Sequence, residues 1–113
     1  MNYNFTTYPT FERELKRLAK KYKSMKQDIA TLSKEIVENP DAGTDLGNGI
    51  YKYRLSIASK GKGKRGGGRV ITMNVLVSEN ETEIGFLYIY DKSERTNITD
   101  NEIKELMRKN GLL

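Results

Sequence analysis

The densest group of side chains capable of chemistry lies in residues 59–69, where basic residues alternate with glycines. Its basic members are Lys60, Lys62, Lys64, Arg65 and Arg69. Such a run cannot build a core, so its charges face water or an anion. Glycines let the backbone turn sharply and approach a ligand closely. Two interpretations stay open here: a solvated hairpin loop, and a loop that places cations along a nucleic-acid backbone.

Further candidates for chemistry flank this run. Lys52 and Arg54 lie two residues apart in an alternating segment, so they project from one face of a strand. If Arg69 begins the next strand on that face, the cations form a cluster, which Tyr90 and Lys92 can join from a later strand. Cations so placed bind successive phosphates and stabilise a pentacoordinate phosphoryl transition state. An ordinary solvated strand face is the alternative.

RNA carries its own nucleophile, the 2′-hydroxyl, so a site of this kind can cleave RNA without a metal. It needs a base for that proton, an acid for the departing 5′-oxygen, and cations on the phosphate. Neighbouring cations disfavour one another's charge, so a lysine in the cluster can serve as the base. Tyr90 or a lysine can serve as the acid, and the sequence leaves these roles unassigned.

Composition excludes several classes of catalyst. The chain has no histidine and no cysteine, which rules out Ser–His–Asp and Cys–His nucleophiles and histidine or thiolate metal sites. Acidic residues do not cluster at metal-ligand spacing, so no metal site is predicted. The basic run lacks the G-x-x-x-x-G-K-[ST] pattern of a nucleotide P-loop. A net charge of +5 in 113 residues favours a polyanionic partner, nucleic acid first.

Two amphipathic helices are predicted before the basic run, because apolar residues recur there at helical spacing. In the first helix, after Pro9, these residues are Phe11, Leu15, Leu18 and Tyr22. In the second helix they are Met25, Ile29, Leu32 and Ile36. Ser24 and Gln27 predict a capping box at the start of the second helix, and Asn39-Pro40 ends it. The two helices form a hairpin whose apolar stripes face each other.

Three strands and a short helix are predicted after the hairpin. The strands cover residues 50–58, 69–77 and 82–90 as an antiparallel meander. Residues 3–5 can add a short strand, residues 41–49 are expected to be a loop, and Thr99 with Glu102 predicts a capping box for the last helix. The fold class is α+β: an N-terminal helical hairpin packed on an antiparallel β-sheet, with a short C-terminal helix.

Residues 1–113 are expected to form a single domain, because no repeat or linker divides them. No apolar stretch approaches the roughly 20 residues that span a bilayer, so no membrane partner is expected. Residues 1–10 lack the pattern of a signal peptide. The absence of cysteine agrees with a reducing, cytoplasmic location.

Three segments resemble toxins of the RelE/ParE superfamily of type II toxin–antitoxin systems, and most closely its HigB-like branch. They are YKYRL at residues 51–55, SKGKGKRGGGRVI at 59–71 and IYDKSE at 89–94. Residues 9–22 fit the same family, so the resemblance covers nearly the whole chain in the right order. Its specific part is the glycine–lysine loop followed by G-G-x-R and then Y-x-K-S-E. The resemblance implies the RelE-like toxin fold.

This resemblance also implies a function. The family's ribonucleases enter the ribosomal A site and cut translated mRNA without a metal cofactor, leaving a 2′,3′-cyclic phosphate and a 5′-hydroxyl. A cognate antitoxin blocks the site, and the complex often represses its own operon at operator DNA. By position, the implied catalytic residues are Arg54, Arg69, Lys92 and Tyr90. The implied substrate-binding residues are Lys52, Lys60, Lys62, Lys64 and Arg65.

Some assignments stay open. Tyr90 precedes Lys92, whereas the family's tyrosine lies in a C-terminal tail, so the general acid is unassigned. The ParE branch implies a gyrase inhibitor, against which the lysine-rich loop argues, and a non-catalytic nucleic-acid-binding module has the same charge pattern. The loop itself is expected to be mobile until a polyanion arrives, because lysines on a glycine backbone repel one another.

Overall fold

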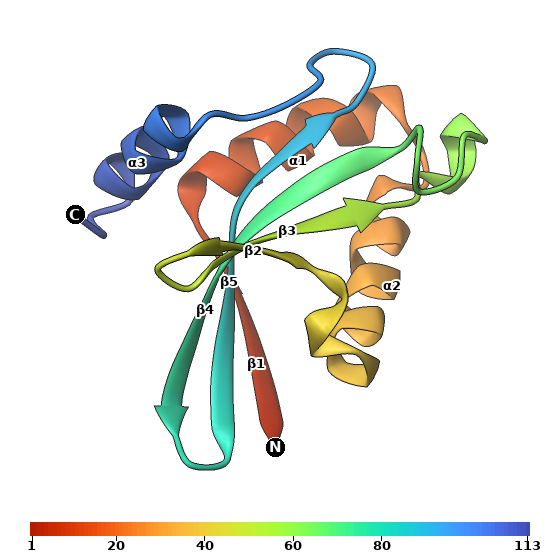
Figure 1. Cartoon of the computed structure of the whole chain (residues 1–113). Helices are drawn as coiled ribbons and strands as arrows, with labels where there is room; N and C mark the ends of the chain where they lie inside the picture. Colours follow the sequence, from red (N-terminus) through yellow and green to blue (C-terminus); the bar gives the residue numbers. More distant parts are fainter.

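A five-stranded sheet with the order β1-β5-β4-β3-β2 forms the centre of the molecule. In the computed structural model, which describes residues 1–113, helices α1 (Pro9–Lys21) and α2 (Met25–Glu38) cover one face of the sheet (Figure 1). Helix α3 (Asp100–Lys109) packs on part of the opposite face. The α+β class, the helical hairpin and the terminal helix are therefore confirmed.

The sheet is mixed rather than wholly antiparallel. Strands β3 (Ile50–Leu55), β4 (Gly68–Ser78) and β5 (Glu81–Asp91) form the predicted meander. Strand β1 (Asn2–Thr7), of which residues 3–5 gave a hint, pairs parallel with β5. Its parallel direction arises because β1 leads straight into α1, which packs back along β5.

The segment expected to be a loop at residues 41–49 contains structure of its own. A 3₁₀ turn, η1 (Pro40–Ala42), leads into β2 (Thr44–Gly47), which pairs antiparallel with β3. The strand predicted at residues 50–58 ends at Leu55 and is followed by a second 3₁₀ turn, η2 (Ala58–Lys60). Strand β2 was not predicted because it is an edge strand of four residues that contains glycine and aspartate, which are both depleted in strands.

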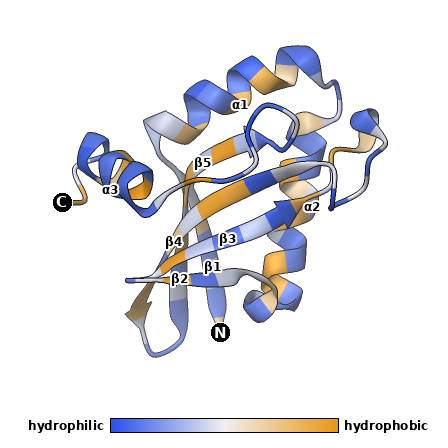
Figure 2. Cartoon of the chain, turned by 45° about the horizontal axis from the view of Figure 1, so that its top comes forward, coloured by the Kyte–Doolittle hydropathy of each residue, from blue (hydrophilic) through white to orange (hydrophobic).

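Two apolar clusters hold the layers together, one on each face of the sheet. The first joins α1 and α2 to the strands through Phe11, Leu18, Met25, Leu32, Ile36, Tyr53, Leu55, Ile57, Val70, Ile84, Phe86 and Ile89. The second joins α3 to the strands through Ile50, Ile71, Leu87, Tyr90, Ile98, Ile103, Leu106 and Met107. Both helical stripes predicted from spacing are thus used, and hydrophilic residues cover the outer sides of the helices (Figure 2).

The two predicted capping boxes have different outcomes. Thr99 accepts the N–H of Glu102 while the Glu102 carboxylate accepts the N–H of Thr99, so the box that starts α3 is confirmed. The box predicted at Ser24 is wrong, since its hydroxyl makes no cap bond. That hydroxyl donates instead to the carboxylate of Asp28 at 2.6 Å, and a charged acceptor forms the stronger bond. None of the helices is both long and apolar enough to cross a membrane.

Candidate anion-binding site

Three neighbouring strands place Arg54, Arg69 and Tyr90 side by side. The pairing register sets Arg54 of β3 opposite Arg69 of β4, and Arg69 opposite Tyr90 of β5. Directly paired residues project from the same face of a sheet, about 5 Å apart. Lys52 lies two residues before Arg54 and shares this face. The structure therefore brings these four predicted site residues together.

Arg69 is a buried cation without an acidic partner. It is 7% exposed, and its guanidinium group donates hydrogen bonds to the carbonyl oxygens of Lys64 and Gly68 at 2.9 and 2.8 Å. Burial lowers the pKa of Arg69, and the neighbouring charge of Arg54 lowers it further. Neither arginine takes part in an ion pair. Two adjacent, uncompensated positive charges attract an anion to this face.

The basic loop is anchored where it leaves β3. The buried carboxylate of Asp28 accepts the N–H of Ala58 at 3.3 Å, and the hydroxyl of Ser24 accepts the N–H of Ser59 at 2.8 Å. Both acceptors belong to the start of α2 or lie just before it. The start of the basic loop is therefore joined to the helical hairpin through the backbone of Ala58 and Ser59.

Glycines allow the loop to fold back onto the sheet. Gly61 and Gly63 have φ values of 72° and 62°, in the left-handed region that other residues rarely adopt. Gly67 passes so close to β3 that a Cβ atom there would lie 2.0 Å from the carbonyl oxygen of Leu55. The glycines therefore serve a compact turn as well as access for a ligand.

Lys60 differs from the other loop cations because its ammonium group is already engaged. It donates to the carboxylate of Asp91 at 2.7 Å and to the hydroxyl of Ser93 at 2.5 Å, and its side chain is 12% exposed. Asp91 is fully buried and also accepts the hydroxyl of Tyr22 at 2.5 Å. Burial would raise the pKa of Asp91, but the bonds from Lys60, Tyr22 and Ser93 outweigh it and hold that pKa well below its usual range.

The remaining loop cations reach solvent. Lys62 and Arg65 are exposed and form no ion pair. Lys64 pairs with Glu35 of α2 at 3.1 Å, where both side chains are substantially exposed, and such a pair contributes about 0–1 kcal/mol. Lys92 is half-buried, and its N–H donates to the carbonyl of Gly67 at 3.0 Å. The ends of the loop and of β5 are thereby joined.

Arg95 belongs to the same surface, and sequence reasoning did not single it out. Its guanidinium carbon lies 5.6 Å from the ring centre of Tyr90 and 6.0 Å from that of Tyr88. It forms an ion pair with Glu102 of α3, whose hydrogen bond raises the pKa of Arg95. One cation beyond the Y-x-K-S-E motif was the available signal, but the approach of Arg95 to the tyrosines depends on the path of residues 92–99.

Tyr90 is buried next to two positively charged side chains. The residue is 2% exposed, and burial raises the pKa of its hydroxyl, whereas the positive charges of Arg69 and Arg95 act in the opposite direction. Its hydroxyl is therefore protonated at neutral pH and can donate a proton rather than accept one.

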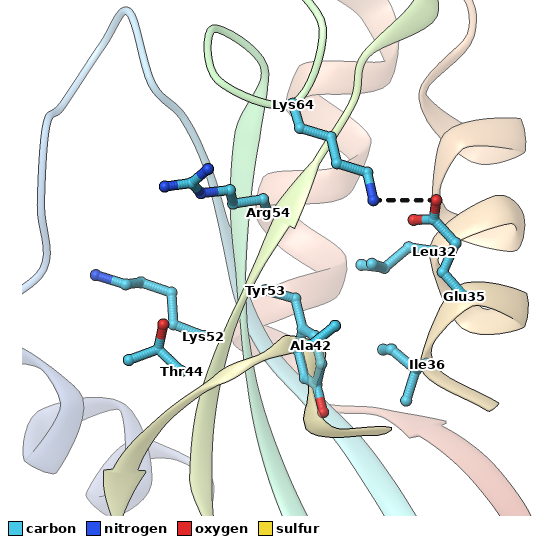
Figure 3. A pocket seen from close by; sticks show the side chains of 9 residues that line it. All are labelled: Leu32, Glu35, Ile36, Ala42, Thr44, Lys52, Tyr53, Arg54 and Lys64. Atoms are coloured by element: carbon cyan, nitrogen blue, oxygen red, sulfur yellow. Dashed lines mark ion pairs between the residues drawn. The ribbon is translucent and has the colours of Figure 1, made fainter. Parts of the chain in front are cut away.

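A hollow of about 340 Å³ adjoins Arg54 at the edge of the sheet (Figure 3). It is lined by Leu32, Glu35, Ile36, Ala42, Thr44, Lys52, Tyr53, Arg54 and Lys64. In Figure 3 the side chains of Lys52 and Arg54 extend to one side of β3, and the Lys64–Glu35 ion pair lies on the other side.

Residues 10–111 match the family model of the RelE toxin of the RelE/RelB toxin–antitoxin system. The chain belongs to the RelE toxin family. This RelE toxin is accordingly the toxin component of a toxin–antitoxin system, and toxins of the family pair with RelB-type antitoxins. The match includes every residue of the cluster, while β1 lies before it.

Proposed function

We propose that this RelE toxin is a ribosome-dependent mRNA endoribonuclease of the HigB-like branch. The observation that carries the proposal is the pair of adjacent arginines without acidic partners, one of them buried, on the face that also presents Tyr90. A buried cation that forms no ion pair is costly to maintain, and an incoming phosphate removes that cost. Endoribonuclease activity is typical of the RelE family.

The proposed reaction transfers the phosphodiester to the neighbouring 2′-oxygen. The 2′-oxygen loses its proton and bonds to phosphorus, the bond to the 5′-oxygen breaks, and that oxygen takes up a proton. Arg54 and Arg69 stabilise the charge on the phosphoryl oxygens. The proposed proton acceptor is one lysine of the cluster, Lys52 or Lys92, in its neutral amine form, and Tyr90 is the proposed donor. No step in this scheme requires a metal ion.

The loop and the partners complete the proposal. The proposed contacts to the RNA backbone come from Lys62, Lys64 and Arg65. Lys62 and Arg65 are exposed, and Lys64 is held only by a weak surface ion pair, so all three can bind phosphates. Lys60 instead positions the loop through Asp91. The proposed place of action is the cytoplasmic ribosome with its mRNA. The proposed regulators are a cognate antitoxin and, through the complex, operator DNA.

Controlled expression with mapping of mRNA 5′ ends tests the function. We expect new 5′-hydroxyl ends inside codons, and a loss of cleavage of about 100-fold or more in Arg54→Ala, since a group that stabilises transition-state charge is removed. Arg13→Ala is the matched control, because Arg13 is an exposed α1 arginine without an ion pair. Growth arrest without such ends would contradict the proposal. A DNA-damage response would then favour a gyrase inhibitor, and RNA binding alone would favour a non-catalytic module.

A further inference from the structure

The hollow beside Arg54 lies at an uncovered part of the sheet edge. Strand β2 pairs with β3 only as far as Lys52, so residues 53–55 have a neighbouring strand on one side alone. Helix α2 stands across from this edge and supplies Leu32, Glu35 and Ile36 to the lining. The hollow therefore lies at the edge of β3, and Arg54, whose side chain extends across this strand, belongs both to its lining and to the proposed phosphate site.

The lining has an apolar floor and a charged rim. Leu32, Ile36 and Tyr53 are nearly fully buried and form the floor, while Arg54 and Lys64 lie at the rim. The volume of about 340 Å³ falls at the lower end of pockets that hold small organic ligands. A nucleobase matches such a lining, because its faces are apolar and its edge carries hydrogen-bonding groups.

Glu35 is the single acidic residue of this lining. An ionised carboxylate accepts hydrogen bonds and donates none. Guanine offers it two adjacent donors, N1–H and the 2-amino group, whereas adenine and cytosine offer one amino group beside an acceptor. Uracil offers one N–H between two carbonyl oxygens, which the carboxylate repels. The chemistry of the hollow thus favours guanine and disfavours uracil.

We propose that this hollow binds a base of the RNA next to the phosphate held by Arg54, and that Glu35 selects guanine there. The inference rests on the proposed function of the site as an RNA-binding site. Nucleotide binding exchanges the partners of one exposed ion pair: Lys64 turns from Glu35 to the phosphate, and Glu35 accepts the base. The exchange is easy because Lys64 and Glu35 are 52% and 40% exposed, and surface pairs of this kind contribute little.

Titration of the purified chain with 5′-GMP, 5′-AMP, 5′-CMP and 5′-UMP tests the proposal, with the methyl NMR signals of Leu32 and Ile36 as readout. We expect GMP to bind about tenfold more tightly than UMP, with shifts at both residues. Glu35→Gln should bring the ratio close to one, because an amide no longer accepts both guanine donors. Glu38→Gln is the matched control: Glu38 is exposed on the same helix, outside the lining, and should keep the ratio.

Two results would overturn the base-selection proposal: equal affinity for the four nucleotides, or an unchanged ratio in Glu35→Gln. The assay needs neither ribosome nor cleavage, so it separates this inference from the proposed function. Selective GMP binding without mRNA cleavage would contradict the endoribonuclease alone. Cleavage without selective binding would contradict the guanine subsite alone.

Discussion

Arg69 and Asp91 show two ways of burying a charge in one small molecule. Asp91 is compensated by Lys60, Tyr22 and Ser93, and its carboxylate is part of the scaffold. Arg69 is satisfied by loop carbonyl oxygens and keeps its net charge. At the scale of residues, a fully compensated charge indicates a structural role, and a charge left without a counter-ion indicates a ligand.

Asp91→Asn should lower the free energy of unfolding by about 3 kcal/mol at pH 7, because the largely buried ammonium group of Lys60 loses its negatively charged partner. The pKa of Asp91 is depressed in the folded chain, so its stabilisation is present above the unfolded value of about 3.9 and declines as pH falls below it. Chemical denaturation of both proteins between pH 7 and pH 3 measures this. The gap between them should narrow toward pH 3.

The Asp91 comparison has an internal control. Lys60→Met with Asp91→Asn should cost less than the sum of the two single changes, since the first variant removes the cation that the second leaves unpaired. A difference between wild type and Asp91→Asn that stays constant across the pH range would contradict the assignment.

At the scale of the elements, the stability of α3 depends on the capping box at its first turn. It is a helix of 10 residues that covers part of one face, and both bonds of its capping box are present. Thr99→Ala should therefore cost about 1 kcal/mol in thermal or chemical unfolding. Thr96→Ala is the matched control, since Thr96 is exposed and lies outside the helix. Equal effects of the two substitutions would show that the box contributes nothing.

The β4–β5 hairpin extends beyond β3 and leaves a free apolar edge (Figure 1). Val75, Leu76 and Val77 are 42%, 65% and 51% exposed, and β5 is their one neighbouring strand. Free apolar edges promote edge-to-edge association. The apparent molar mass measured by light scattering should therefore rise with concentration in the wild type and rise less in Leu76→Lys. The free energy of unfolding of the variant should be unchanged within about 0.5 kcal/mol. The same scattering in both proteins would contradict this.

The spacing of apolar and polar residues within single segments predicted the helices and the three central strands. The helical stripes and the meander came from periodicity, and alternation within β3 placed Lys52 and Arg54 on one face. The backbone pairing of β3 with β4 sets Arg54 opposite Arg69, although the long basic loop at residues 56–67 connects the two strands. The partner of Lys60 was not predictable in this way, because Asp91 lies 31 residues further along the chain. The parallel pairing of β1 with β5 was not predictable for the same reason, because the paired residues lie far apart in the sequence.

At the scale of the whole molecule, charge is segregated. Residues 70–91 contain no lysine or arginine and carry Glu79, Glu81 and Glu83. On the helical hairpin, a groove of about 610 Å³ is lined by Lys16, Lys20, Lys23 and Lys26. A molecule with this field should present its basic regions to RNA and turn the β4–β5 hairpin away.

Binding to ribosomes should accordingly weaken steeply with salt, because each phosphate that the protein neutralises releases counterions. Sedimentation at several salt concentrations measures the slope. Lys20→Gln combined with Lys23→Gln should reduce the slope by about one for each phosphate that the variant no longer binds. Glu79→Gln should leave the salt slope unchanged, because Glu79 lies on the β4–β5 hairpin. An equal change of slope in Glu79→Gln and in the double lysine variant would contradict the proposal that the basic regions face RNA.

The parallel pairing of β1 has a consequence for the order of assembly. Asn2 pairs with Glu81, so the first strand to be synthesised finds its neighbour only after most of the chain has followed it. Contacts between residues so distant in sequence form slowly compared with hairpins. Until then residues 81–86 of β5 have an open side, whereas Tyr90 and the two arginines lie beyond the part of β5 that pairs with β1. A newly made chain therefore completes this edge of its sheet late, and its arginine face does not depend on that step.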